Sequence, residues 1–129
     1  MTLHTLSSGS QGNCLLLSDG GTHILVDAGI STRRIKAGLA QLELSMDELD
    51  GILITHEHTD HISGLATLIK HHAVPLYASP GTARQLAYRL AGVEPLLRPR
   101  DPGTEFCIGS CRVTAFATSH DAAQSMDYR

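Results

Sequence analysis

The chain has 129 residues, of which 42% are hydrophobic and 18% charged, and its formal net charge is −3 with the histidines neutral. These values fit one soluble globular domain, and the sequence holds no apolar run long enough to cross a membrane. The negative charge gives no general attraction for nucleic acid, three cysteines without a spaced framework argue against a disulfide scaffold, and a polar N-terminal segment without a leader predicts a cytoplasmic location.

The first third of the chain predicts three short strands and a helix. The strands are the apolar segments Leu3–Leu6, Cys14–Ser18 and His23–Val26. Asp19-Gly20-Gly21, between the second and third strands, is typical of a tight hairpin. A helix is expected over residues 31–41, because a serine at its start is a good N-cap and the apolar side chains fall on one face.

The middle of the chain alternates strands with helices. Gly51–Ile54 is typical of a buried strand, and Ile62–Ile69 repeats apolar residues at helical spacing. A further strand is expected over Pro75–Ala78. Ser79-Pro80 then begins a helix over residues 79–90, because serine caps a helix and proline fits its first turn.

A hairpin is predicted near the end of the chain, from Glu105–Ile108 and Arg112–Ala117. Cys107 and Cys111 flank its turn, and we expect them to be small buried side chains, with a pair facing across the strands as the alternative. Hairpins at both ends and alternating elements between them predict an α/β (α+β) fold, a mixed sheet covered by helices on one face.

The segment Thr55–His61 places four candidate metal ligands, three imidazoles and the Asp60 carboxylate, within six consecutive residues. Neutral imidazole and carboxylate are ligands for Zn²⁺ and related divalent ions. His56 and His58 are two apart, so in extended chain they point the same way and can bind one ion. Asp60 and His61 enter the first turn of the following helix and are candidates for a second ion. The alternative is a solvated loop that happens to be rich in histidine.

Other polar residues lie near this segment. Glu57 is not expected to be a catalytic base, because the pattern differs from a helical pair of histidines four apart. Asp27 closes an apolar strand, where an unpaired carboxylate is costly. We therefore expect it to accept hydrogen bonds from the segment Thr55–His61, behind the metal ligands. The alternative is that Asp27 caps the turn that follows it. The Ser7–Asn13 loop is favoured as a plain connection over a phosphate cradle. Arg33-Arg34 and Arg98-Pro99-Arg100 are favoured as ordinary surface over phosphate contacts.

These motifs resemble a known family. His56-x-His58-x-Asp60-His61 resembles the signature of the metallo-beta-lactamase-fold hydrolases. Val26-Asp27-Ala28-Gly29 resembles the first motif of that family, and Ser119-His120-Asp121 resembles its third. The segments Leu6–Cys14 and Ile54–Leu65 are similar to the YycJ-like, or WalJ-like, bacterial subgroup, whose members resemble nucleases and phosphodiesterases.

The resemblance implies half of an αββα sandwich. Residues 1–129 would form the N-terminal part of the domain, and the C-terminal half, with a bridging aspartate and a final histidine, is absent. One ion would be bound by His56, His58 and His120, although on the residues alone His120 is an isolated histidine after a strand. Asp60 and His61 would bind a second ion. The intact enzyme would then hold two Zn²⁺, with Mn²⁺ as the alternative.

The function implied is that of a metal-dependent hydrolase, a phosphodiesterase or nuclease of exonuclease type that uses a metal-bound hydroxide. Asp60 would orient the nucleophile as well as bind metal, and the substrate would be nucleic acid or a small phosphodiester. One alternative is hydrolysis of a lactone, thioester or β-lactam. Another is a non-catalytic fragment that binds metal weakly, either cut short or derived from a gene fragment, and that pairs with a missing half or a second copy.

Overall fold

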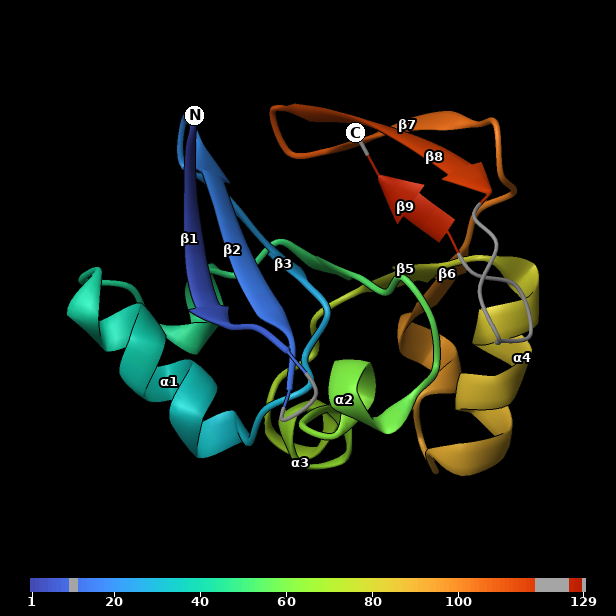
Figure 1. Cartoon of the computed structure of the whole chain (residues 1–129), viewed down its shortest axis with the longest axis horizontal. Coiled ribbons are helices and arrows are strands. Elements are labelled where there is room, and N and C mark those ends of the chain that lie inside the picture. Colours follow the sequence, from blue (N-terminus) through green and yellow to red (C-terminus); the bar gives the residue numbers. More distant parts are fainter. Residues whose placement is uncertain (10–11, 118–125, 129) are drawn as a thin grey trace.

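A computed structural model describes residues 1–9, 12–117 and 126–128. Two sheets and a set of helices form three layers (Figure 1). The larger sheet has six strands in the order β1-β2-β3-β4-β5-β6. Its strands are β1 Thr2–Ser7, β2 Cys14–Asp19, β3 Thr22–Val26, β4 Gly51–Leu53, β5 Leu76–Ala78 and β6 Leu97–Pro99.

The larger sheet is mixed. β1, β2 and β3 are antiparallel neighbours, and the β2–β3 hairpin turns at the expected Asp19-Gly20-Gly21. β3, β4, β5 and β6 are parallel to one another. The carboxyl ends of these four strands therefore meet at one edge of the sheet, which is where ligand sites form in such sheets.

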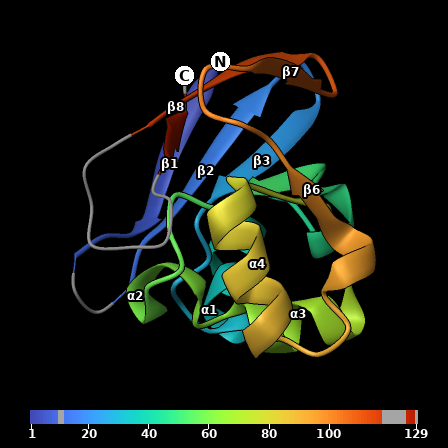
Figure 2. The ribbon, with the colours of Figure 1, turned by 90° about the vertical axis from the view of Figure 1, so that its right-hand side faces the viewer.

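The helices lie on one face of the larger sheet (Figures 1 and 2). In the part of the chain that is described, no helix is long and apolar enough to span a bilayer. The α-helices are α1 Thr32–Gln41, α2 Thr59–Ile62, α3 Leu65–His71 and α4 Pro80–Arg89. Two 3₁₀ turns cover Met46–Glu48 and Glu94–Leu96.

The smaller sheet lies against the opposite face of the larger one, as Figure 2 shows at the top. It consists of the antiparallel strands β7 Glu105–Ile108, β8 Cys111–Ala117 and β9 Met126–Tyr128. The β7–β8 hairpin was expected from the sequence. The Tyr128 hydroxyl fastens β9 to the larger sheet by donating to the Ile54 carbonyl at 2.8 Å.

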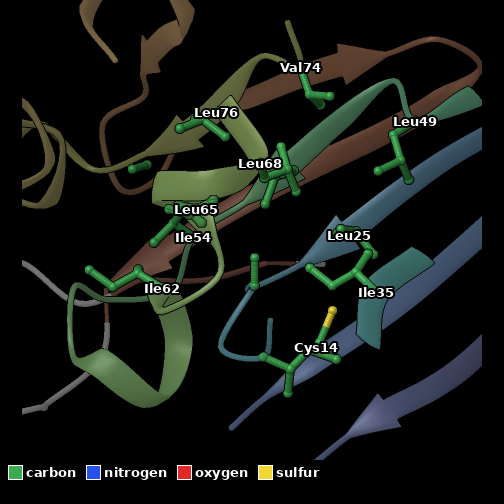
Figure 3. Close-up of a cluster of buried hydrophobic side chains, with 14 of the residues drawn as sticks. Cys14, Leu25, Ile35, Leu49, Ile54, Ile62, Leu65, Leu68, Val74 and Leu76 are labelled. Carbon is green, nitrogen blue, oxygen red and sulfur yellow. The ribbon is translucent and has the colours of Figure 1, made fainter. Parts of the chain in front are cut away.

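The main core lies between the larger sheet and the helices (Figure 3). Leu16, Leu25, Ile52 and Leu76 point into it from successive strands and are fully buried. The alternating neighbours point to the other face, where Ile24 and Leu53 meet the smaller sheet. Strand side chains alternate between faces, so this sheet buries apolar groups on both.

A cavity of about 590 Å³ lies between the two sheets. Its apolar lining includes Leu15, Leu17, Val26, Leu53 and Val113. At its rim Leu3 is 57% exposed and Phe116 is 37% exposed. The smaller sheet therefore covers only part of the apolar face that the larger sheet presents.

The mixed sheet with helices on one face confirms the fold class predicted from the sequence. One predicted helix is wrong: the segment after the metal motif forms two helices, α2 and α3. Two carbonyls that a continuous helix would use are engaged elsewhere, because Asp60 O accepts from Asn13 N and His61 O accepts from Ala28 N. Gly64 N correspondingly donates to Ala28 O instead of to the carbonyl four residues earlier. Packing against two loops thus interrupts the helix.

The cysteines also differ from expectation. Cys111 is buried, but Cys107 is exposed and faces Arg112 across the β7–β8 pair. The two cysteines therefore do not face each other. All three, Cys14 included, are free thiols.

Candidate metal centre

The candidate site lies at the carboxyl edge of β3 and β4. These strands are parallel neighbours with Val26 opposite Leu53, so the residues that follow each strand come together. Asp27 N donates to Leu53 O at 2.7 Å and continues the pairing by one bond. The metal loop, residues 55–61, starts immediately beyond this point and leads into α2.

Within the metal loop, His56, His58 and Asp60 each offer one ligand atom, and these atoms lie within 4.8 Å of one another. The rings of His56 and His58 are 4.7 Å apart between centroids and nearly perpendicular. The His61 ring lies beside His56 at 3.8 Å, and its Nε2 is 3.5 Å from Asp60 Oδ2. The structure thus brings together the four ligands proposed in this segment, with Asp60 close both to the two histidines His56 and His58 and to His61.

The Asp27 carboxylate is hydrogen-bonded to the metal loop. Its side chain is 3% exposed and accepts three hydrogen bonds. Oδ1 accepts from Thr55 N at 2.8 Å, and Oδ2 accepts from Thr55 Oγ1 at 2.8 Å and from His61 Nδ1 at 2.5 Å. Asp27 also has a φ of 62°, a left-handed conformation that aspartate tolerates better than most residues. The structure thus shows the hydrogen bonds that were expected from this loop, and the role of Asp27 behind metal ligands stays a prediction.

The Asp27 contacts set the hydrogen positions on two histidines. His61 Nδ1 donates to Asp27, so in the neutral ring Nε2 carries the lone pair that faces the site. The single hydrogen of the Thr55 hydroxyl goes to Asp27, so that hydroxyl accepts from His56 Nδ1 at 3.0 Å. His56 Nε2 is then the nitrogen that bears the lone pair. Such partners behind a ligand fix its tautomer and orientation.

The pKa of His61 reflects the same contacts. Burial lowers this pKa, but the hydrogen bond from the ring to Asp27 and the negative charges of Asp27 and Asp60 raise it more. The net result is a pKa above the ordinary value of 6.5. The two carboxylates therefore make the protonated form of this ring more favourable than it is in water.

Glu57 is buried although it lies between two proposed ligands. It is 5% exposed, and its Oε1 accepts from the Thr82 hydroxyl at 3.3 Å, at the start of α4. The Glu57 carbonyl accepts from Arg89 Nη1 at 3.0 Å, at the end of the same helix. Glu57 thus joins the metal loop to α4. That Glu57 is not a base stays a prediction.

Sequence reasoning missed Asn13, which it placed in a plain connecting loop. The Asn13 Nδ2 atom lies 3.2 Å from Asp60 Oδ2 and 3.3 Å from His61 Nε2. The residue follows a glycine-rich loop and immediately precedes a strand. A polar side chain at such a strand start was the available signal, but the partner is 47 residues away and could not be identified from spacing.

Two further histidines and two arginines have local partners. His23 Nδ1 contacts Ser18, and His72 pairs with Asp47. Arg98 donates to backbone carbonyls, and Arg100 lies over the rings of Tyr77 and Phe106. The proposed ligand His120 lies outside the described residues.

The donor set fits a divalent metal ion. Two imidazole nitrogens and a carboxylate oxygen converge in the group formed by His56, His58 and Asp60. This combination suits Zn²⁺ and related ions, and three protein ligands leave room for water or substrate in catalytic zinc sites. His61 Nε2 next to Asp60 adds a further nitrogen donor at the side of this group.

Comparisons with known proteins agree on a family. The sequence profile of the metallo-beta-lactamase superfamily matches residues 8–120. Exodeoxyribonuclease YycJ of Bacillus anthracis is 37% identical over 136 residues, which cover 99% of this chain and 50% of that protein. Ribonuclease Z of Methanopyrus kandleri is 29% identical over 122 residues, covering 89% of this chain and 42% of that enzyme. The chain thus spans about half the length of the curated relatives it matches.

Solved structures show the same fold. Rm3 metallo-beta-lactamase superposes with a TM-score of 0.79 at 26% sequence identity. The match covers 98% of this chain and 52% of that structure. The three-layer arrangement described above therefore corresponds to about half of the folded lactamase.

Proposed function

The chain belongs to the metallo-beta-lactamase superfamily, and we propose that the intact protein is a metal-dependent nuclease that hydrolyses phosphodiester bonds in the manner of an exonuclease. The observation that carries this proposal is the similarity of 99% of the chain to exodeoxyribonuclease YycJ at 37% identity. The likeness to a ribonuclease Z supports the same bond type. The convergence of His56, His58 and Asp60 supplies a site of suitable chemistry.

We propose that His56 and His58 hold one ion together with His120, and that Asp60 and His61 hold a second. Two Zn²⁺ ions are our first choice, with Mn²⁺ as the alternative, because imidazole and carboxylate ligands accept both. A pair of divalent ions supplies acidified water and offsets charge on the phosphoryl oxygens. The net charge of −3 on the chain makes such compensation important for an anionic substrate.

Residues next to the proposed ligands fix the orientation of the ligand side chains. Asp27 fixes the Thr55 hydroxyl and the His61 ring, and Thr55 in turn fixes His56. Asp60, which is next to both groups of ligands, is proposed as the carboxylate that also accepts a hydrogen bond from the attacking water. Asp60 lies in the first turn of α2, and its side chain is 35% exposed.

A second candidate is hydrolysis of a β-lactam, lactone or thioester. The likeness of the fold to Rm3 metallo-beta-lactamase favours it, since the same metal chemistry attacks carbonyl carbon as well as phosphorus. One fold hosts many reactions, so the fold does not decide between them. The greater sequence identity to the nuclease places phosphodiester hydrolysis first.

The test uses the intact protein that carries this chain, loaded with Zn²⁺ or with Mn²⁺. We expect release of nucleotides from end-labelled linear DNA, and much slower turnover of a chromogenic β-lactam, a lactone and a thioester. The opposite ranking would replace the nuclease proposal by the second candidate. Metal binding without turnover of any of these substrates would indicate a non-catalytic role.

Replacing Asp60 tests its proposed role directly. We expect Asp60→Ala to lower nuclease turnover by orders of magnitude at saturating metal, because the carboxylate both binds metal and orients water. Asp101→Ala, at an exposed acid away from the metal loop, is the matched control and should leave turnover unchanged. Full turnover by Asp60→Ala, with an unchanged circular dichroism spectrum, would contradict the role.

A further inference from the structure

The orientation of the Asn13 amide is fixed by the peptide group of Gly9. Gly9 N donates to Asn13 Oδ1 at 3.1 Å, and Asn13 Nδ2 donates to Gly9 O at 2.9 Å. A flipped amide would place a donor against a donor and an acceptor against an acceptor. The Nδ2 atom must therefore be the one that faces the metal loop.

The Nδ2 atom faces two atoms that the proposed function assigns to the second ion. It lies 3.2 Å from Asp60 Oδ2 and 3.3 Å from His61 Nε2. His61 Nδ1 already donates to Asp27, so Nε2 can accept a hydrogen from the amide. When the His61 ring is neutral, Asn13 thus bridges the carboxylate and the imidazole.

The Asn13 backbone has little freedom to move. Asn13 N donates to Asp60 O at 2.7 Å, and Asn13 O accepts from Gly29 N at 2.9 Å. A Cβ on Gly29 would overlap the Asp60 carbonyl oxygen, and a Cβ on Gly12 would overlap the Gly29 carbonyl oxygen. Close backbone approach therefore locks three segments, the Asn13 loop, the turn after β3 and the start of α2.

We propose that Asn13 is a positioning residue for the second metal ion, an inference that rests on the proposed two-ion function. One Nδ2 hydrogen stays on Gly9 O, and the other faces the Asp60 carbonyl, Asp60 Oδ2 and His61 Nε2. An ion bound at His61 Nε2 would leave that hydrogen to the Asp60 oxygens, where it would orient the carboxylate. The first ion, at His56 and His58, does not depend on this amide.

The experiment is a stepwise titration of the metal-free intact protein with Co²⁺ and with Zn²⁺ against a chromogenic chelator. Visible Co²⁺ spectra follow each step. We expect Asn13→Ala to weaken the second ion by roughly 10- to 100-fold, the usual effect of removing a partner behind a ligand, with the first step unchanged. Ser8→Ala, at an exposed position of the same loop, is the control and should alter neither step.

The unchanged first step also serves as the check that the variant folds. Equal weakening of both steps by Asn13→Ala would assign Asn13 a purely structural role and overturn the inference. Two unchanged steps would also overturn it, because the amide would then have no effect on metal binding. Failure of the proposed function looks different, because the parent protein itself would then lack one or both metal-binding steps. That result would remove the second site and this inference together.

Discussion

At the scale of single residues, Asp27 has the most demanding position in the chain. It combines a buried carboxylate, three accepted hydrogen bonds and a positive φ. Removing the carboxylate leaves the Thr55 amide and hydroxyl and the His61 ring without their acceptor. Buried donors that lose their acceptor cost about 1 to 3 kcal/mol each, and the losses are not additive.

We therefore expect Asp27→Ala to lower the free energy of unfolding by several kcal/mol, on the order of 3. Asp27→Gly removes the same hydrogen bonds but suits the left-handed backbone, so it should be about 1 kcal/mol less harmful. Urea unfolding of the metal-free protein, followed by circular dichroism, measures both. If Gly proves no better than Ala, the backbone conformation makes no contribution here.

The raised pKa of His61 makes stability depend on pH in the metal-free protein. A group whose pKa is higher when folded binds protons more strongly in the native state, so its contribution is complete below the unfolded pKa near 6.5. The contribution is then lost as pH rises through the folded pKa. We expect the difference in unfolding free energy between the parent and His61→Gln to shrink from pH 6 upward. A difference that grows with pH would contradict the direction of the shift.

Sequence reasoning identified the candidate ligands of the metal loop because they are adjacent in the chain. His56 and His58 owe their common direction to a two-residue spacing, which is visible without coordinates. Asn13 was missed for the opposite reason, since its role depends on how a loop packs against α2. Asp27 lies between these cases: the cost of a buried carboxylate indicated a partner, and the structure identifies Thr55 and His61.

At the scale of elements, helix α4 is tied to the metal loop through Glu57. The Glu57 carboxylate and the Thr82 hydroxyl are both buried, and they lie at the helix N-terminus, where Ser79 caps Thr82 N. Negative charge is stabilised at this end of a helix. The contact therefore ties two elements that are separate in the sheet order.

We expect Glu57→Ala and Thr82→Ala each to lower the free energy of unfolding by about 1 to 3 kcal/mol, as for a buried polar group that loses its partner. The double variant should lose less than the sum, with a coupling of about 0.5 kcal/mol or more. Arg84→Ala, exposed on the same helix, is the control. Additive losses in the double variant would mean that Glu57 and Thr82 act independently.

Most elements could be predicted because their signals are local. Ser31 and Ser79 cap α1 and α4 as expected, each accepting from the backbone N three residues on. Strand β6 was missed because Leu97–Pro99 is short, contains a proline and an arginine, and becomes a strand only by pairing with β5. The split between α2 and α3 likewise follows from hydrogen bonds to distant loops, which local periodicity does not encode.

At the scale of the whole molecule, the cavity between the sheets leaves apolar surface accessible. We expect the isolated 129-residue chain to self-associate, because exposed Leu3 and Phe116 border this cavity and uncovered apolar patches favour association. Light scattering across a concentration series measures the effect. Leu3→Ser with Phe116→Ser should reduce association, whereas Tyr88→Ser, at a 90% exposed aromatic on α4, should not. A monomer at every concentration would contradict this expectation.

The contacts that hold the metal loop join residues that are synthesised at different times. Asn13 precedes Asp60 by 47 residues, and Asp27 precedes His61 by 34. Chains grow at about 5 to 20 residues per second. Asn13 and Asp27 are therefore synthesised before the residues that they contact, and β7 and β8 follow seconds later. Asn13 and Asp27 are thus present in the growing chain before the metal loop is made, and the second sheet is made after it.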